Sequence, residues 1–139
     1  MERYIELFKY AYTRPKKFEG RACRAELASF AIPYTLIVMV VMMVAFFFFG
    51  LGAGLENSAI SAIGVILFIA LFIFGFASIP AAFGVSCRRL HDLNMSGWLL
   101  ALNFVPFINY IAGIVFFVLL YFIPGTEGDN QYGPISEKY

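Results

Sequence analysis

The 139-residue sequence has few of the residues that build metal sites, disulfide frameworks and soluble surfaces. It contains two cysteines and one histidine, so we expect no disulfide framework, no metal site and no cofactor. Charged residues make up 14% and hydrophobic residues 61%, whereas a soluble domain is about 25% charged and about 45–50% apolar. The N-terminus has no short apolar segment with a small-residue cleavage site, so we expect no removable signal peptide. These absences predict a single integral membrane domain covering residues 1–139.

Three long stretches without charge dominate the chain. Residues 27–49 form the first, and its 23 residues would extend over about 34 Å as a helix, enough to cross the hydrocarbon of a bilayer. Residues 59–85 form the second. The third covers residues 98–123 and is interrupted by Pro106. The predicted fold is therefore an all-α membrane protein with three transmembrane helices.

The third stretch leaves two alternatives open. We expect it to cross the membrane once. However, Pro106 together with Asn109 could turn the chain back and make the segment kinked or re-entrant. Asn103 and Asn109 are the strongest polar residues at membrane depth. Such amides usually hydrogen-bond across helices, and a ligand role is the less expected alternative.

The segments outside these stretches are polar or amphipathic. Residues 1–26 begin with Tyr4, Ile5, Phe8 and Tyr12 on one side of a helix, which predicts a short amphipathic helix in the membrane interface. The alternative is a helix packed on a protein partner. Pro15 should end this helix, and the basic residues at 14–17 and after them form a cytoplasmic lead-in. Residues 124–139 form a polar tail.

Small residues indicate where helices turn and pack. The glycines of residues 50–54, followed by polar residues up to 58, predict the turn between the first two spans. Gly75, Ser78 and Ala82 recur at helical spacing in the second span. Such a row lets helix backbones approach closely in a membrane, so it also offers a surface for a homo-oligomer.

A charged island, residues 87–98, separates the second and third stretches. It holds the only histidine and the only tryptophan of the chain. Arg88, Arg89, His91 and Asp92 supply its polar groups, and Trp98 closes it as an expected anchor at the membrane interface. The island is either a polar site or a loop that fixes two helix ends.

The distribution of basic residues predicts the orientation. Seven Lys and Arg residues precede residue 27, none lies in 50–58, two lie in the island and one lies in the tail. Because cytoplasmic loops carry the excess of Lys and Arg, the N-terminus should be cytoplasmic. A single crossing by residues 98–123 would then leave the C-terminus outside. This orientation also places Arg21, Arg24 and Glu26 at the same face as the island, so the two segments could form one cluster.

Three motifs carry a family resemblance. They are Phe18–Glu26, which contains Arg-x-x-Arg-x-Glu, then Arg88–Asp92 with Ser96–Trp98, and finally Pro124–Pro134. In this order they resemble the DUF805 family of bacterial inner-membrane proteins, which includes YhaH-like proteins. Leu27 stands where the family usually has an aromatic residue, and Gln131 stands where a basic residue is common. The resemblance implies a small helical protein of the bacterial inner membrane and implies no activity.

The best-supported function is a non-catalytic module at the cytoplasmic face that binds an anionic membrane lipid or a partner protein. The residues that suit phosphate or carboxylate are the guanidinium donors Arg21, Arg24, Arg88 and Arg89. Glu26, His91 and Asp92 would support them, and His91 could respond to pH. The alternative is that these charges only pair with one another and fix helix ends.

Two other functions are weighed against this one. An oligomeric transporter or channel is disfavoured because the three stretches hold no Asp, Glu, Lys, Arg or His. A lipid-modifying enzyme is disfavoured because His91 and Asp92 are adjacent on the chain and would point about 100° apart on a helix. We therefore expect no enzyme activity, and nothing in the chain indicates a nucleic-acid partner.

Overall fold

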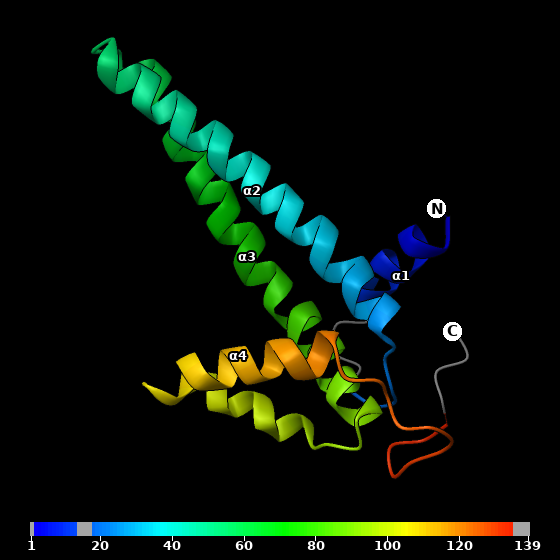
Figure 1. Cartoon of the computed structure of the whole chain (residues 1–139). Coiled ribbons are helices and arrows are strands. Elements are labelled where there is room, and N and C mark those ends of the chain that lie inside the picture. The colour runs from blue at the N-terminus through cyan, green and yellow to red at the C-terminus, as the bar shows by residue number, and fades with distance from the viewer. Residues whose placement is uncertain (1, 14–17, 135–139) are drawn as a thin grey trace. The chain divides into compact units, whose positions relative to one another are not determined.

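The computed structural model describes residues 2–13 and 18–134. In chain order its elements are α1 (Glu2–Thr13), α2 (Arg24–Gly54), α3 (Ser58–Asp92), the 3-10 helix η1 (Gly97–Phe104) and α4 (Ile108–Tyr121) (Figure 1). The described residues form helices and connections without a β-strand, so the all-helical prediction is confirmed. Pro15, the basic residues at 14–17 and the end of the tail at 135–139 lie outside the described residues. The chain divides into unit 1 (Met1–Ala31 and Pro80–Tyr139) and unit 2 (Ile32–Ile79).

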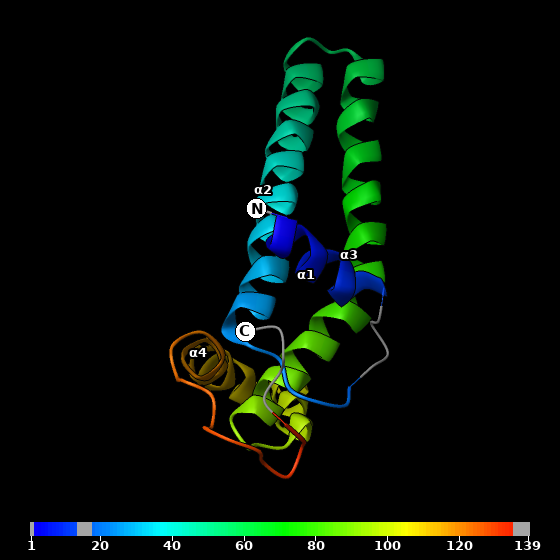
Figure 2. The same cartoon turned by 90° about the vertical axis from the view of Figure 1, so that its right-hand side faces the viewer.

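Unit 2 is a hairpin of two apolar helices, the central parts of α2 and α3, which lie side by side in both views (Figures 1 and 2). Its helices meet closely at Gly64, where an added Cβ would overlap the backbone at Ala45 and Phe49. Tyr34 stacks on Phe74, with ring centroids 5.6 Å apart. The missing side chain of Gly64 therefore allows the two helices to approach closely at this position.

Helices α2 and α3 are both long and apolar enough to cross a membrane. Only 11% and 6% of their most apolar stretches are buried within the structure. A core helix of a soluble protein would be covered on most sides, so these exposed apolar surfaces suit contact with lipid. The first two predicted spans match these helices, although both helices extend beyond the predicted bounds.

The loop between α2 and α3 is shorter than predicted. Helix α2 continues through Gly54, so the expected turn at residues 50–54 is wrong. Glu56 ends the helix with a φ of 53°, and the Asn57 N–H donates to the Gly52 carbonyl at 2.8 Å. The Asn57 side chain then accepts from the N–H groups of Ala59 and Ile60 at 3.1 and 3.2 Å, which caps α3.

The third apolar stretch does not form one continuous helix, so the single spanning helix expected over residues 98–123 is not formed. It folds as η1 and α4, which pack against each other, as the re-entrant alternative proposed. The chain reverses at Phe107, whose φ is 66°, and the Ile108 N–H closes a tight turn on the Pro106 carbonyl at 2.8 Å. Helix α4 has 14 residues, about 21 Å, which is too short for a hydrocarbon core of about 30 Å.

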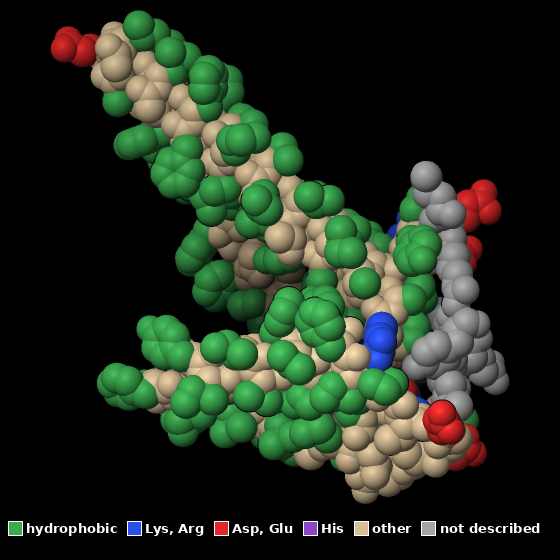
Figure 3. All heavy atoms as spheres, viewed as in Figure 1, with side chains coloured by type: hydrophobic (Ala, Val, Ile, Leu, Met, Phe, Trp, Pro, Cys, Tyr) green, Lys and Arg blue, Asp and Glu red, His purple; other side chains and the backbone are tan. Residues whose placement is uncertain are grey.

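Hydrophobic side chains cover the visible face of η1 and α4 (Figure 3). On α4, Tyr110, Ile111 and Ile114 are among the most exposed hydrophobic residues of the described chain. The opposite face of α4 contributes Ala112, Phe116 and Leu120 to the core of unit 1. This helical pair therefore has one face against the protein and one face suited to lipid.

Helix α1 packs within unit 1 through a face that only partly overlaps the one expected to enter the membrane interface. Leu7 and Ala11 are buried, and the Phe8 ring lies 6.4 Å from the Phe30 ring at the start of α2. Tyr4 and Ile5 remain exposed. The helix is amphipathic as predicted, but much of its apolar face contacts this chain, which is closer to the alternative of packing against protein.

Candidate functional site

Asp92, in the last turn of α3, lies at the centre of a buried group of charges. Its carboxylate accepts from Arg21 at 2.9 Å and also from Arg89, one turn earlier on α3. All three side chains are almost fully buried, with 1% exposure or less. One carboxylate thus pairs with two guanidinium groups that lie 68 positions apart in the sequence.

A second buried ion pair lies beside the first. The Arg88 guanidinium donates to Glu26 at 2.6 Å, and their side chains are 4% and 2% exposed. The Arg88 guanidinium also lies over the ring of Tyr10, 5.4 Å from its centroid, in a cation–π contact with α1. We call Arg21, Glu26, Arg88, Arg89 and Asp92 the arginine cluster.

Arg89 of the arginine cluster and the neighbouring exposed Arg24 also satisfy carbonyls at the end of α4. Arg89 donates to the carbonyls of Leu120 at 3.0 Å and Ile123 at 2.5 Å. Arg24 donates to the carbonyls of Ile123 at 3.1 Å and Phe122 at 2.8 Å. The last carbonyls of a helix have no partner within it, and cations there also suit the helix dipole. These arginines therefore provide partners for carbonyls at the C-terminal end of α4.

The tail closes the cluster from the other side. Arg21 donates to the carbonyls of Thr126 and Gly128, both at 2.6 Å. The Thr126 N–H and hydroxyl both donate to the Asp92 carbonyl, at 2.9 and 3.0 Å. Asn130 donates to the His91 carbonyl at 2.8 Å. The tail therefore lies against the island, which does not fit the expectation that it emerges on the opposite side of the membrane.

The structure brings together the two segments that were expected to meet, Arg21–Glu26 and the island. A ligand site needs guanidinium groups that are accessible and available to donate, but these arginines already donate within the chain. Arg21, Arg88 and Arg89 are buried and donate to carboxylates and carbonyls of this chain, while Arg24 is exposed. The cluster fits the alternative in which the charges pair with one another and fix helix ends.

Other predicted residues lie away from the cluster. Asn103 is half-buried in η1, and Asn109 is exposed in the first turn of α4. Sequence reasoning missed the contribution of Thr126, Gly128 and Asn130 to the cluster. All three residues lie in the third motif, Pro124–Pro134, which contains no basic residue and so was not considered as part of a charged site.

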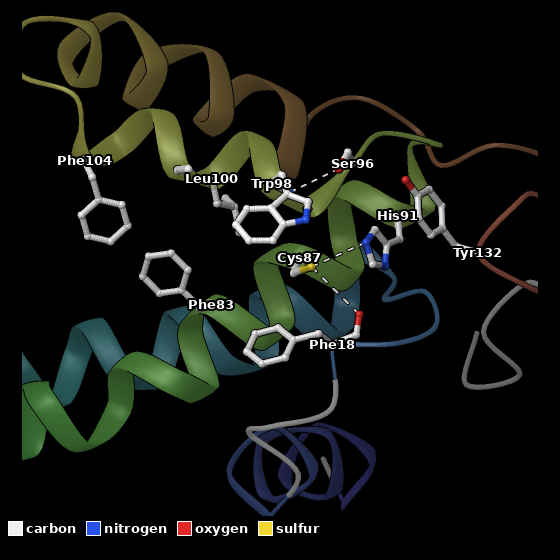
Figure 4. A pocket seen from close by; sticks show the side chains of 11 residues that line it. Phe18, Phe83, Cys87, His91, Ser96, Trp98, Leu100, Phe104 and Tyr132 are labelled. Atoms are coloured by element: carbon white, nitrogen blue, oxygen red, sulfur yellow. Dashed lines mark hydrogen bonds between the residues drawn. The ribbon is translucent and has the colours of Figure 1, made fainter.

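An apolar pocket of about 600 Å³ lies beside the cluster (Figure 4). It lies between the end of α3, η1, the lead-in residue Phe18 and the tail. We call it the aromatic pocket because five of its lining residues carry a phenyl, phenol or indole ring; its lining consists of Phe18, Phe83, Cys87, His91, Ser96, Gly97, Trp98, Leu100, Ala101, Phe104 and Tyr132.

The apolar part of the pocket reaches the protein surface, where exposed aromatic rings line its opening. The Phe83 and Phe104 rings stack with centroids 5.6 Å apart, and Phe104 is 72% exposed. Trp98 is 86% exposed, as suits its predicted place at the membrane interface. A molecule in the pocket could therefore extend an apolar chain into the bilayer.

The polar end of the pocket is organised around His91. Its Nδ1 lies 3.2 Å from the Gly20 carbonyl, and its Nε2 lies 3.6 Å from the Cys87 sulfur. Because a carbonyl only accepts, a neutral His91 would carry its proton on Nδ1 and accept from the thiol at Nε2. The Tyr132 ring stacks on the imidazole, with centroids 3.9 Å apart and planes 3° apart.

The close Cys87–His91 pair invites comparison with a thiol nucleophile and its base. Cys87 lies beyond the second predicted span, residues 59–85. Burial raises the pKa of the Cys87 thiol, and the nearby charge of Arg88 offsets this only in part. A raised pKa favours the unreactive thiol form. Within residues 2–13 and 18–134, no cluster of side chains suits a metal ion.

A family model matches most of this chain, and curated proteins similar to this chain are bacterial inner membrane proteins. The family model described as "Protein of unknown function (DUF805)" matches residues 16–134. The inner membrane protein YhaI of Escherichia coli K12 is 30% identical over 116 residues, covering 84% of this chain and 82% of that protein. The inner membrane protein YhaH of the same strain is 29% identical over 117 residues, covering 84% of each. No solved structure gives a significant match.

Proposed function

The chain belongs to the DUF805 family of membrane proteins, and from this premise we propose that it is a non-catalytic module that binds a membrane lipid at the cytoplasmic face of the inner membrane. The observation that carries the proposal is the aromatic pocket. Its volume of about 600 Å³ lies within the range of about 300–1,000 Å³ that is usual for small-molecule sites. Its apolar lining and one polar end match the two parts of an amphiphile.

The pocket is placed for a ligand that arrives from the bilayer. Its outer residues Trp98 and Phe104 are highly exposed and belong to η1, whose visible face, like that of α4, is covered by hydrophobic side chains (Figure 3). Large exposed apolar surfaces of this kind mark contact with a membrane or a partner. A lipid could enter laterally and leave its head at His91 and Tyr132, near the polar island.

In this proposal the arginines have a supporting role. They hold the tail against α3, and both elements contribute pocket walls; they also bind the end of α4, which packs on η1, the third wall. The lipid therefore does not need to bind the guanidinium groups, which already donate to Asp92, Glu26 and backbone carbonyls. In this proposal the ligand binds in the aromatic pocket, beside the arginine cluster, and does not contact the arginines predicted to bind it.

The same proposal includes a revised orientation. The excess of Lys and Arg before the first span favours a cytoplasmic N-terminus. Because the tail hydrogen-bonds to the end of α3, it should lie at the same face. Two crossings by α2 and α3, with α4 re-entrant, would then place every Lys and Arg of the sequence on the cytoplasmic side.

Native mass spectrometry of protein released gently from membranes tests the binding function. Ala101 is exposed and lines the pocket, so Ala101→Phe should fill the space without disturbing a buried contact. Val115 is an exposed residue of α4 outside the pocket lining, so Val115→Phe is a matched control. We expect a lipid adduct on the wild-type and Val115→Phe proteins and its loss from Ala101→Phe. An adduct that persists on all three, or is absent from all three, would overturn the proposed site.

A further inference from the structure

We propose that the lipid bound in the aromatic pocket has a neutral, planar head that accepts hydrogen bonds, as a membrane quinone does. This inference rests on the proposed function and adds the chemical class of the ligand. It follows from three features of the pocket: the kind of hydrogen-bonding groups at its polar end, the aromatic surfaces beside them and the occupation of the nearby guanidinium groups.

The polar end of the pocket offers donors of neutral type. Tyr132 has a phenol O–H, Ser96 has a hydroxyl and Trp98 has an indole N–H. In Figure 4 the indole nitrogen lies on the side of the ring toward His91, and the Tyr132 ring lies beyond the imidazole. The two nitrogens of His91 face Gly20 and Cys87. A head group that presents carbonyl oxygens would be a suitable partner for the phenol and the indole.

The aromatic surfaces favour a flat head. His91 and Tyr132 stack almost in parallel, so the polar end already holds one pair of planar rings. Trp98 and Phe18 present further rings to the same space (Figure 4). Aromatic rings pack on other flat rings in offset or tilted arrangements at centroid distances of about 4.5–7 Å. A quinone ring could add to this group, whereas a glycerophosphate head has no planar surface to offer.

Charge favours a neutral head over a phosphate. Among residues 2–13 and 18–134, the pocket lining includes no Lys, Arg, Asp or Glu. Arg88 and Arg89 follow Cys87 directly, but they donate to Glu26, Asp92 and the end of α4. Phosphate recognition usually relies on forked arginine donors or helix N-termini. The groups of this pocket would leave a phosphate without a counter-charge.

The remaining lining suits the apolar tail of such a molecule. Phe83, Leu100 and Phe104 extend the pocket away from the polar end (Figure 4). Since Phe104 is exposed, a tail longer than the pocket can continue into the bilayer. Only the head and the first part of the tail need to be bound within the protein.

The single tryptophan makes the proposal directly measurable. Trp98 lines the pocket and is the only tryptophan in the chain, so its fluorescence reports on this site. Purified protein in detergent is titrated with a decyl-substituted benzoquinone, which quenches indole fluorescence. Quinone dissolved in the micelle also quenches an exposed indole, but that component rises steadily and does not saturate. We expect a saturable component in the wild-type and Val115→Phe proteins and only the steady component in Ala101→Phe.

A second variant tests the head group. Tyr132→Phe keeps the ring that stacks on His91 and removes only the hydroxyl, so it should weaken the saturable binding about three- to tenfold, as loss of one hydrogen bond does. Unchanged affinity would overturn the assigned contact of the phenol. Quenching without a saturable component in wild-type protein would overturn the quinone inference. If the lipid adduct that Ala101→Phe removes is then a phospholipid, the proposed function stands; if there is no adduct either, both fail.

Discussion

Replacing Asp92 by Asn should make unit 1 open more often, although the substituted side chain has nearly the same shape. The substitution removes one negative charge and keeps the size of the side chain. Arg21 and Arg89 would then remain buried, with exposures of 1% or less for their side chains, and would lose the carboxylate they share. Asp129 provides a matched control because it is exposed in the tail, so Asp129→Asn makes the same chemical change in water.

The magnitude follows from the burial of the pair. Removing one partner of a buried ion pair costs about 3–5 kcal/mol, because the other charge is left without compensation. Since about 1.4 kcal/mol corresponds to a factor of ten, opening of unit 1 should become roughly 10²- to 10⁴-fold more frequent. Asp129→Asn should change it by less than about twofold, as surface substitutions usually do.

The thiol of Cys23 reports this opening. Cys23 is 1% exposed and lies between Arg21 and Arg24, so a maleimide can reach it only when unit 1 opens. Labelling in inner-membrane vesicles, followed at the peptide level by mass spectrometry, separates Cys23 from the half-buried Cys87. The labelling rate of Cys23 should rise in proportion to the frequency of opening. Equal rates in Asp92→Asn and Asp129→Asn would refute the reasoning that buried charge pairing holds unit 1 together.

Two further predictions follow from the same contacts. An added Cβ at Gly125 would overlap the Asp92 carboxylate, whereas one at Gly113 in α4 would meet no neighbour within 4 Å. Gly125→Ala should therefore accelerate the labelling of Cys23. Gly113→Ala should not accelerate it, since Gly113 lies in a helix and Ala is a better helix former than Gly by about 1 kcal/mol. Faster labelling in Gly113→Ala than in Gly125→Ala would contradict the packing of the tail on Asp92. Cysteines placed at the exposed positions Glu56 and Glu127 should differ toward a membrane-impermeant thiol reagent applied to spheroplasts. The first should react from outside and the second only after permeabilisation, and labelling of both from outside would contradict the cytoplasmic tail.

Local properties of the chain were sufficient to predict its helical and membrane character. Uncharged stretches as long as 27–49 and 59–85 leave a helix as the suitable form in lipid, because every backbone group must then find a partner within the segment. The three motifs likewise predicted the family, and the match over residues 16–134 confirms it. The meeting of Arg21–Glu26 with the island could be anticipated from the predicted orientation, which places both segments at one face.

Tertiary contacts decided the course of residues 98–123 and the role of the arginines. The same apolar residues could make one helix of spanning length, but in the fold they turn at Pro106–Phe107, and Arg24 and Arg89 satisfy carbonyls at the end of α4. Those donors come from other elements, so no local pattern indicates them. The inward direction of Arg21, Arg88 and Arg89 also depends on Asp92, Glu26 and the tail being brought to the same place. A charged motif gives the identity of its groups, but only the assembled fold determines whether they face a ligand or one another.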